Sequence, residues 1–135
     1  MSQSTMSDTH KPVRVLEAAF VCYPIVQVPR ARHFYETLFG LTPSHTVGDD
    51  TEAFIEYELG NATFVISNMG GGTPSTQGPS IAFEVEDFEQ TIAALRQYPA
   101  RFIVEPFETR VCFMALVEDP EGNGLIIHKR KPEHA

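Results

Sequence analysis

The first half of the chain alternates short apolar stretches with polar ones, in an order typical of a mixed α and β fold. Residues 17–28, EAAFVCYPIVQV, are apolar and rich in β-branched and aromatic side chains, which predicts a buried strand. Residues 29–39 follow at once, with a proline suited to a first helical turn and apolar residues spaced to share one helix face. The pattern predicts a strand and then a helix, which Gly40 ends in a left-handed conformation. The shared helix face consists of Ala31, Phe34, Tyr35, Leu38 and Phe39.

Two further strands and a linker complete this half. After the polar loop TVGDDTE, the stretch AFIEYELGNATFVIS contains two short apolar strands around Gly60 and Asn61. This dipeptide supplies the positive φ that a tight antiparallel hairpin needs. The following NMGGGTPSTQGPS has the Gly, Ser and Pro content of a flexible linker.

The same order of elements then begins again. SIAFEVED predicts a strand, FEQTIAALRQY a helix with Phe88, Ile92 and Leu95 on one side, and RFIVEP a short strand. TRVCFMALVEDPEGNGLIIHK predicts two strands joined by the turn DPEGN. The second half shows four strands and a helix and the first half three strands and a helix, and we interpret each half as a βαβββ unit. Such a unit is too small to cover its own apolar sheet face and must pack on another unit.

We expect an α+β fold in which two paired βαβββ units have curved mixed sheets around a ligand cavity. In each unit the helix covers one side of its sheet and leaves the other side free to face the cavity. The polar start of the chain contains no apolar stretch of signal-peptide length, and no later stretch is long enough to span a bilayer, so we expect a cytoplasmic protein. The expected divisions are an N-terminal tail (1–16), one domain (17–130) with unit one (17–68), linker (69–79) and unit two (80–130), and a C-terminal tail (131–135).

Composition narrows the partners that the chain can bind. The formal charge of −8, from 10 Lys and Arg against 18 Asp and Glu, argues against nucleic acid and would suit a cationic ligand better. Cys22 and Cys112 lie in apolar runs without metal-type spacing, which predicts two buried, reduced thiols.

Two βαβββ units, with FYETLFGL in the first helix and DPEGN before the last strand, resemble the vicinal oxygen chelate superfamily. This superfamily includes glyoxalase I, the extradiol dioxygenases, fosfomycin resistance proteins and bleomycin-binding proteins. The resemblance covers residues 17–130. It implies the fold and a cavity, but the reaction must be argued from the site.

In metal-dependent members of this superfamily, the resemblance implies ligands on the first and last strand of each unit. Counting seven residues back from Gln27 and Asp87 gives Phe20 and Ser80, and counting four beyond the glycine of each closing hairpin gives Phe64 and Ile126. These side chains offer at best one weak hydroxyl, so we expect neither a metal nor another cofactor. A shift of one residue gives Val21, Val65, Ile81 and Ile127, none of which is a ligand.

Alternation along the strands identifies candidate cavity residues. Cys22 and Glu84 share the face of Phe20 and Ser80, so Glu84 either points into the cavity or sits at a solvated rim. His128 shares the face of Ile126, where it could be a base, a donor or a hydrogen-bonded residue at the cavity mouth, and a shift of two residues would make it a metal ligand.

The hairpin at Gly60 places Tyr57 opposite Phe64 on the cavity side, together with Ile55 and Ile66, and places Glu56 and Glu58 outside. Met114 could form an adaptable wall, and Arg110 could pair with Glu84 or an anionic ligand, or simply be solvated. His33 and His45 are expected to be exposed. The full set for the cavity is Phe20, Cys22, Tyr57, Phe64, Ile66, Ser80, Glu84, Met114, Ile126 and His128.

The leading hypothesis is metal-independent binding of a small aromatic or cationic molecule by a homodimer, as the bleomycin-binding branch sequesters a drug. No nucleic acid or membrane partner is expected, and no catalytic residue is assigned. A second hypothesis is a metal-dependent lyase, isomerase or dioxygenase with displaced ligands drawn from His128, Glu84 and Cys22. A third is a non-catalytic partner-binding subunit with a vestigial cavity. The units could pair within one chain or between chains.

Overall fold

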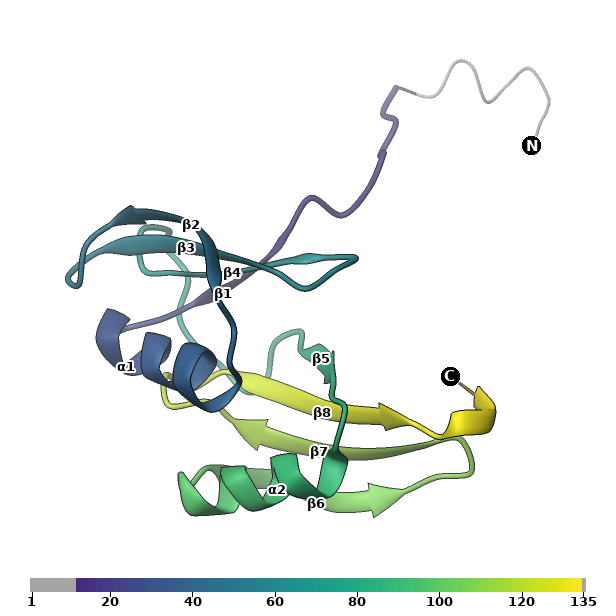
Figure 1. Cartoon of the computed structure of the whole chain (residues 1–135). Coiled ribbons are helices and arrows are strands. Elements are labelled where there is room, and N and C mark those ends of the chain that lie inside the picture. The colour runs from purple at the N-terminus through teal and green to yellow at the C-terminus, as the bar shows by residue number, and fades with distance from the viewer. Residues whose placement is uncertain (1–11, 135) are drawn as a thin grey trace.

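The computed structural model describes residues 12–134 and contains two units with the same order of elements (Figure 1). The first unit contains β1 (Val21–Pro24), α1 (Val28–Arg32), the π-helix η2 (His33–Leu38), β2 (Pro43–Gly48), β3 (Ala53–Glu58) and β4 (Thr63–Ser67). The second contains β5 (Ile81–Glu84), α2 (Phe88–Gln97), β6 (Arg101–Glu108), β7 (Cys112–Glu118) and β8 (Gly124–Arg130), and the short 3₁₀ helix η3 (Pro132–His134) follows. The predicted α+β fold with a duplicated βαβββ order is confirmed.

Each unit forms its own four-stranded mixed sheet. Sheet A has the order β1-β4-β3-β2 and sheet B the order β5-β8-β7-β6. The outer strand pairs β1–β4 and β5–β8 are parallel, and the others are antiparallel. Figure 1 shows the two sheets one above the other with α1 between them. Strands β1 and β5 each have one edge that no strand of the described chain pairs with.

The two faces of each sheet differ in burial. In sheet B, Phe83 and Ile127 are buried, whereas their neighbours Glu84 and His128 point to the other side and are at least partly exposed. We call these sides the covered face and the open face. The covered faces bury the core, because a sheet of this size must cover one apolar side to be stable.

The first helix forms as its sequence pattern predicts. Ala31, Phe34 and Tyr35 are fully buried, and Gly40 has a φ of 70°, so it ends the helix in the left-handed region that glycine favours. The last turn is wider than that of an α-helix, because the N–H of Phe39 donates to the carbonyl of Phe34, five residues back, at 3.3 Å.

Two strands of the first unit differ from the prediction. The strand expected over residues 17–28 is paired only over Val21–Pro24, and the residues before it have no strand partner in this chain. Strand β2 occupies a stretch that was expected to be partly loop, and it pairs with β3 along one edge. Nearly all of its residues are exposed, so its sequence carries no apolar alternation that could have revealed it.

The core joins the two units through aromatic side chains. The ring of Phe64 on β4 lies 5.1 Å from the ring of Tyr35 and 5.4 Å from that of Phe83 on β5, measured between centroids. All three side chains are buried. Edge-to-face packing of this kind favours one fixed arrangement of the two units.

The DPEGN turn between β7 and β8 holds the second unit to the first helix. One carboxylate oxygen of Glu121 accepts the N–H groups of Val26 and Gln27, each at 2.7 Å, and the other accepts Nε of Arg30 at 2.6 Å. At the start of α2, the cap residue Asp87 accepts a backbone N–H with its own side chain. The corresponding residue of α1, Gln27, makes no such hydrogen bond. Glu121 therefore caps α1 from the other unit.

The same turn fixes its own geometry and the position of Tyr35. Oδ1 of Asp119 accepts the backbone N–H groups of Glu121, Gly122 and Asn123, each at 2.9 Å. Oδ2 of Asp119 accepts the hydroxyl of Tyr35 at 2.6 Å. The turn thus links both units through buried, charge-assisted hydrogen bonds.

The ends of the chain frame this domain. Of the expected tail 1–16, residues 1–11 lie outside the described residues, as does residue 135 of the C-terminal tail. Residues 12–20 project from the body with exposed apolar side chains at Val13, Val15 and Leu16 (Figure 1). Between residues 12 and 134, no helix is both long enough and apolar enough to cross a membrane.

Candidate functional site

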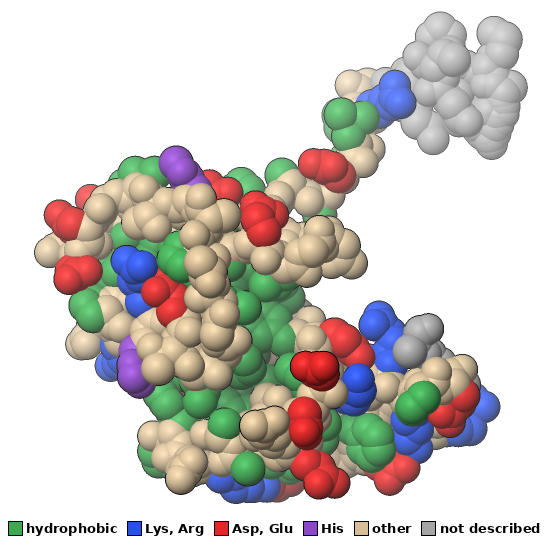
Figure 2. Space-filling model, viewed as in Figure 1, with side chains coloured by type: hydrophobic (Ala, Val, Ile, Leu, Met, Phe, Trp, Pro, Cys, Tyr) green, Lys and Arg blue, Asp and Glu red, His purple; other side chains and the backbone are tan. Residues whose placement is uncertain are grey.

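A cleft of about 970 Å³ lies between the two units, on both sides of strand β5. Its upper lip is the hairpin between β3 and β4, and its lower wall consists of β5, the start of α2 and the end of β8. Figure 2 shows this hollow open to the right, with hydrophobic side chains at its back and acidic ones on its lower lip. The volume is sufficient for a drug-sized ligand.

The back of the cleft is apolar and rigid. Phe39, from the end of the first helix, packs on Phe83 of β5 with ring centroids 5.5 Å apart, and Leu95 of α2 lies beside them in the same core cluster. These residues come from three elements of both units, so the apolar wall exists only when the units pack together. A flat apolar ligand would gain free energy by covering this wall.

A polar cluster lies on the open face of sheet B at one end of the cleft. Nδ1 of His128 is 2.5 Å from Oε1 of Glu84, and the N–H of Arg130 donates to Oε2 of Glu84 at 2.7 Å. The guanidinium of Arg130 lies 3.6 Å from the same carboxylate. All three residues line the cleft.

The surroundings of Glu84 keep it ionised. Its partial removal from water raises the pKa, but the hydrogen bonds from the N–H of Arg130 and from His128, with the positive charge of the Arg130 guanidinium nearby, outweigh this and lower the pKa overall. Glu84 therefore carries its charge at neutral pH and lines the cleft; that it contacts a ligand stays a prediction.

The duplication shows that this cluster is not a requirement of the fold. Glu84 pairs with His128 across the parallel strands of sheet B, and Pro24 pairs with Ser67 at the corresponding place in sheet A. The first unit thus forms the same strand pair without an acid or an imidazole. A polar pair that only one unit needs is a candidate for function rather than for folding.

Several other predicted residues also lie on the open faces. Met114 is directly opposite His128 on β7, and Ile126 precedes it by two residues on β8. On sheet A, Phe20 and Cys22 are exposed, and Ser80 is exposed just before β5. That a ligand contacts these residues stays a prediction.

The predicted orientation of β3 and β4 is wrong. Tyr57, Phe64 and Ile66, with Ile55, are fully buried in the core on the covered face, whereas Glu56 pairs with Val65 on the open side. The two hairpins have different loops: Glu58 pairs with Thr63, but Glu118 pairs with Gly124. Counting four residues from each glycine therefore ends on opposite faces, and Val65 rather than Phe64 corresponds to Ile126.

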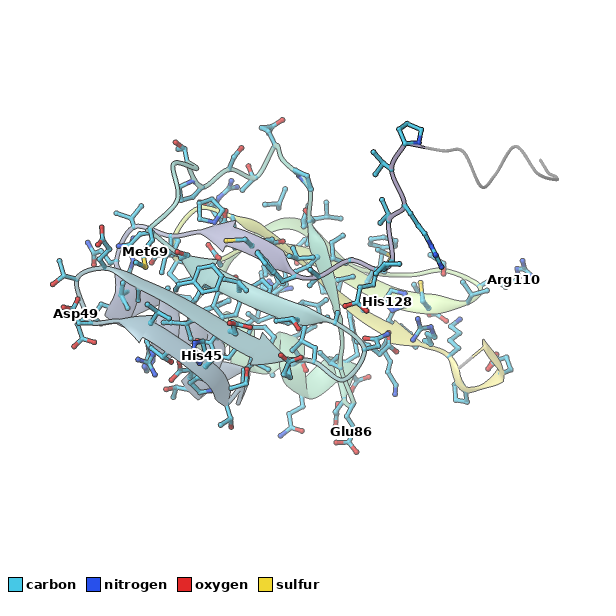
Figure 3. The ribbon with its side chains drawn as sticks, turned by 90° about the horizontal axis from the view of Figure 1, so that it is seen from above. His45, Asp49, Met69, Glu86, Arg110 and His128 are labelled. Carbon is cyan, nitrogen blue, oxygen red and sulfur yellow. The ribbon has the colours of Figure 1, made fainter. Side chains whose placement is uncertain are left out.

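Three further expectations concern thiols, histidines and Arg110. Cys112 is buried as expected, but Cys22 is exposed. His33 and His45 are exposed as predicted, and Arg110 is also exposed. Figure 3 shows His45 apart from His128, and His45 is not among the residues that line the cleft.

Sequence reasoning missed the apolar back of the cleft and the role of Glu121. The helix face containing Phe39 was identified, but nothing in its spacing shows that it meets β5 of the second unit. Gln27 is a poor helix cap, so the N–H groups at the start of α1 need an acceptor from elsewhere in the chain. This could have suggested a capping role for the acid of DPEGN.

The sequence also matches a family profile, described as Glyoxalase/Bleomycin resistance protein/Dioxygenase superfamily, over residues 18–127. The chain belongs to this superfamily. No curated protein is a significant match in sequence.

Several solved structures share the fold at low sequence identity. TnmS3, an antibiotic binding protein from Streptomyces sp. CB03234, is 14% identical with a TM-score of 0.71, and the match covers 88% of this chain and 99% of that one. A glyoxylase/bleomycin resistance protein/dioxygenase domain from Frankia sp. EAN1pec is 17% identical with a TM-score of 0.66, covering 87% and 100%. Lactoylglutathione lyase from Agrobacterium tumefaciens is 11% identical with a TM-score of 0.65, covering 86% and 95%.

The metal site implied by the superfamily does not fit the residues present. With the register corrected, the four positions are occupied by Phe20, Val65, Ser80 and Ile126, which provide one hydroxyl between them. Within residues 12–134, no group of three or more His, Cys, Asp and Glu side chains could hold a metal ion. Glu84 and His128 come together as a pair, without the further donors that a stable site requires.

Proposed function

We propose that this protein binds a small, largely apolar organic molecule in the cleft between its two units, and that binding does not require a metal. The observation that carries the proposal is the cleft itself: about 970 Å³ with an apolar back and one polar cluster at its end. Pockets that bind small molecules typically combine a large apolar wall with a few placed polar groups. An antibiotic binding protein among the structural neighbours supports binding as the activity.

The cleft argues against the hypothesis of a vestigial cavity. In a subunit that only binds another protein, we would expect large apolar side chains to have filled the space. Instead, small side chains line part of it, including Ala82 and Ala94. The absence of a third donor beside Glu84 and His128 in the described residues likewise argues against a displaced metal centre.

We also propose that the protein is a homodimer. The segment before β1 exposes Val13, Val15 and Leu16 at 73%, 82% and 80%, and strand β5 has a free edge that lines the cleft. An exposed apolar segment and an unpaired strand edge are both unfavourable in an isolated chain, and strand addition between two copies would remove both. The partner's segment would then form a further wall of the cleft.

The binding proposal can be tested with 2-methoxynaphthalene, a neutral aromatic probe. Titration into chelator-treated protein, followed by backbone amide chemical shifts, should give a Kd on the order of 0.1 mM. The shifts should be confined to residues around the cleft. Added zinc, nickel or manganese should leave the affinity unchanged.

A pair of matched variants locates the site. Ala82→Phe places a large side chain in the cleft and should weaken binding about tenfold or more, whereas Ala93→Phe, on an exposed part of α2 outside the cleft, should not. Binding that appears only after a metal is added, or equal binding by both variants, would contradict the proposal.

A further inference from the structure

We propose that His128 selects ligands that carry an acidic hydroxyl, such as a phenol or an enol, by accepting a hydrogen bond from that hydroxyl at Nε2. This inference rests on the proposed function of the cleft and names the chemical class of its ligand.

The first step concerns the proton on Nδ1. An ionised carboxylate only accepts hydrogen bonds, and Oε2 of Glu84 already accepts the backbone N–H of Arg130 at 2.7 Å. The contact of 2.5 Å between Oε1 and Nδ1 of His128 therefore requires a proton on Nδ1. The carboxylate holds the imidazole in one orientation and one tautomer.

The second step concerns the other ring nitrogen. A neutral imidazole with its proton on Nδ1 presents a lone pair at Nε2. Among residues 12–134, no side chain or backbone group donates a hydrogen bond to this atom, and His128 lines the cleft with 22% of its side chain exposed. In the neutral form of His128, Nε2 is thus an acceptor available to a ligand.

The third step concerns the kind of donor. Arg130 lines the same end of the cleft, and its guanidinium favours negative charge on a nearby oxygen. The oxygen of an acidic hydroxyl gains such charge when its proton is shared with Nε2. Phe39 and Ala82, which line the cleft, provide apolar contacts for the rest of the ligand. Met114 and Ile126 lie beside His128 on the same face of the sheet, outside the lining of the cleft. An aromatic body with a phenolic hydroxyl matches this arrangement better than an alcohol, whose hydroxyl is a weaker acid.

Three probes of similar size test the inference: 2-naphthol, 2-methoxynaphthalene and 2-naphthoate. Wild-type protein should bind 2-naphthol about tenfold more tightly than 2-methoxynaphthalene, because only the naphthol can donate to Nε2. In His128→Phe this preference should disappear, so that the ratio of the two Kd values falls to about one, whatever the change in the affinity for 2-methoxynaphthalene. His45→Phe, an exposed histidine on β2 away from the cleft (Figure 3), is the matched control and should keep the preference.

Glu84→Gln tests whether the carboxylate positions the imidazole. An amide can donate as well as accept, so Nδ1 no longer has to carry the proton, and the ratio of the affinity for 2-naphthol to that for 2-methoxynaphthalene should fall several-fold. A purely structural role of Glu84 would weaken both probes equally.

The outcomes separate this inference from the proposed function. Equal binding of 2-naphthol and 2-methoxynaphthalene by the wild type, or a preference that survives in His128→Phe, overturns the hydroxyl inference and leaves the apolar binding site in place. Tighter binding of 2-naphthoate than of 2-naphthol would show that His128 acts as a protonated donor to anions, which also overturns it. Binding of none of the three probes would overturn both proposals.

Discussion

At the residue scale, Glu121 is the side chain on which the attachment of the first helix depends most. Its buried carboxylate satisfies two backbone N–H groups at the start of α1 and pairs with Arg30. Replacing it with alanine should lower the free energy of unfolding by about 2–3 kcal/mol, because buried donors lose a charged partner. Urea unfolding measures this, and Glu86→Ala, an exposed acid, should change the value by less than about 0.5 kcal/mol.

The same residue makes an acid-dependent contribution. Burial tends to raise the pKa of Glu121, but its hydrogen bonds with Arg30, Gln27 and Val26 lower it overall. A carboxyl group with a lowered pKa stabilises the fold above its unfolded pKa, and this stabilisation is lost as the pH falls through the folded pKa. The stability gap between wild type and Glu121→Gln should therefore narrow in acid, and a constant gap would contradict this account.

At the element scale, the first helix ends at a glycine that needs a left-handed backbone. Gly40 has a φ of 70°, and an added Cβ would meet no atom within 4 Å. An alanine there would therefore be destabilising only through its left-handed backbone conformation. We expect Gly40→Ala to lower the free energy of unfolding by about 1 kcal/mol. Gly70→Ala, in open space without a positive φ, is the control for thermal or urea unfolding and should be nearly neutral.

Elements with one buried face were predictable from the sequence, and those without one were not. The helices and the hairpins followed from apolar spacing and turn residues, whereas β2 is exposed on both sides and left no pattern. Strand faces depend on loop length to a single residue, so Tyr57 and Phe64 lie on the covered face and not on the predicted one, whereas Glu84 and His128 lie on the open face. The apolar back of the cleft needs contacts between units that no local pattern encodes.

At the scale of the whole molecule, the exposed segment before β1 should determine the oligomeric state. Val15 and Leu16 are more exposed than apolar side chains of a stable monomer usually are, and β5 offers an edge to receive them. Light scattering with size exclusion should therefore give about twice the chain mass of 15.0 kDa for the wild type. Val15→Asp with Leu16→Asp should give a monomer, because two charges would enter the interface, whereas Val111→Asp, on the exposed turn before β7, should remain dimeric. A wild type that is monomeric at tens of micromolar would contradict the proposed dimer, and the cleft would then have to bind its ligand within a single chain.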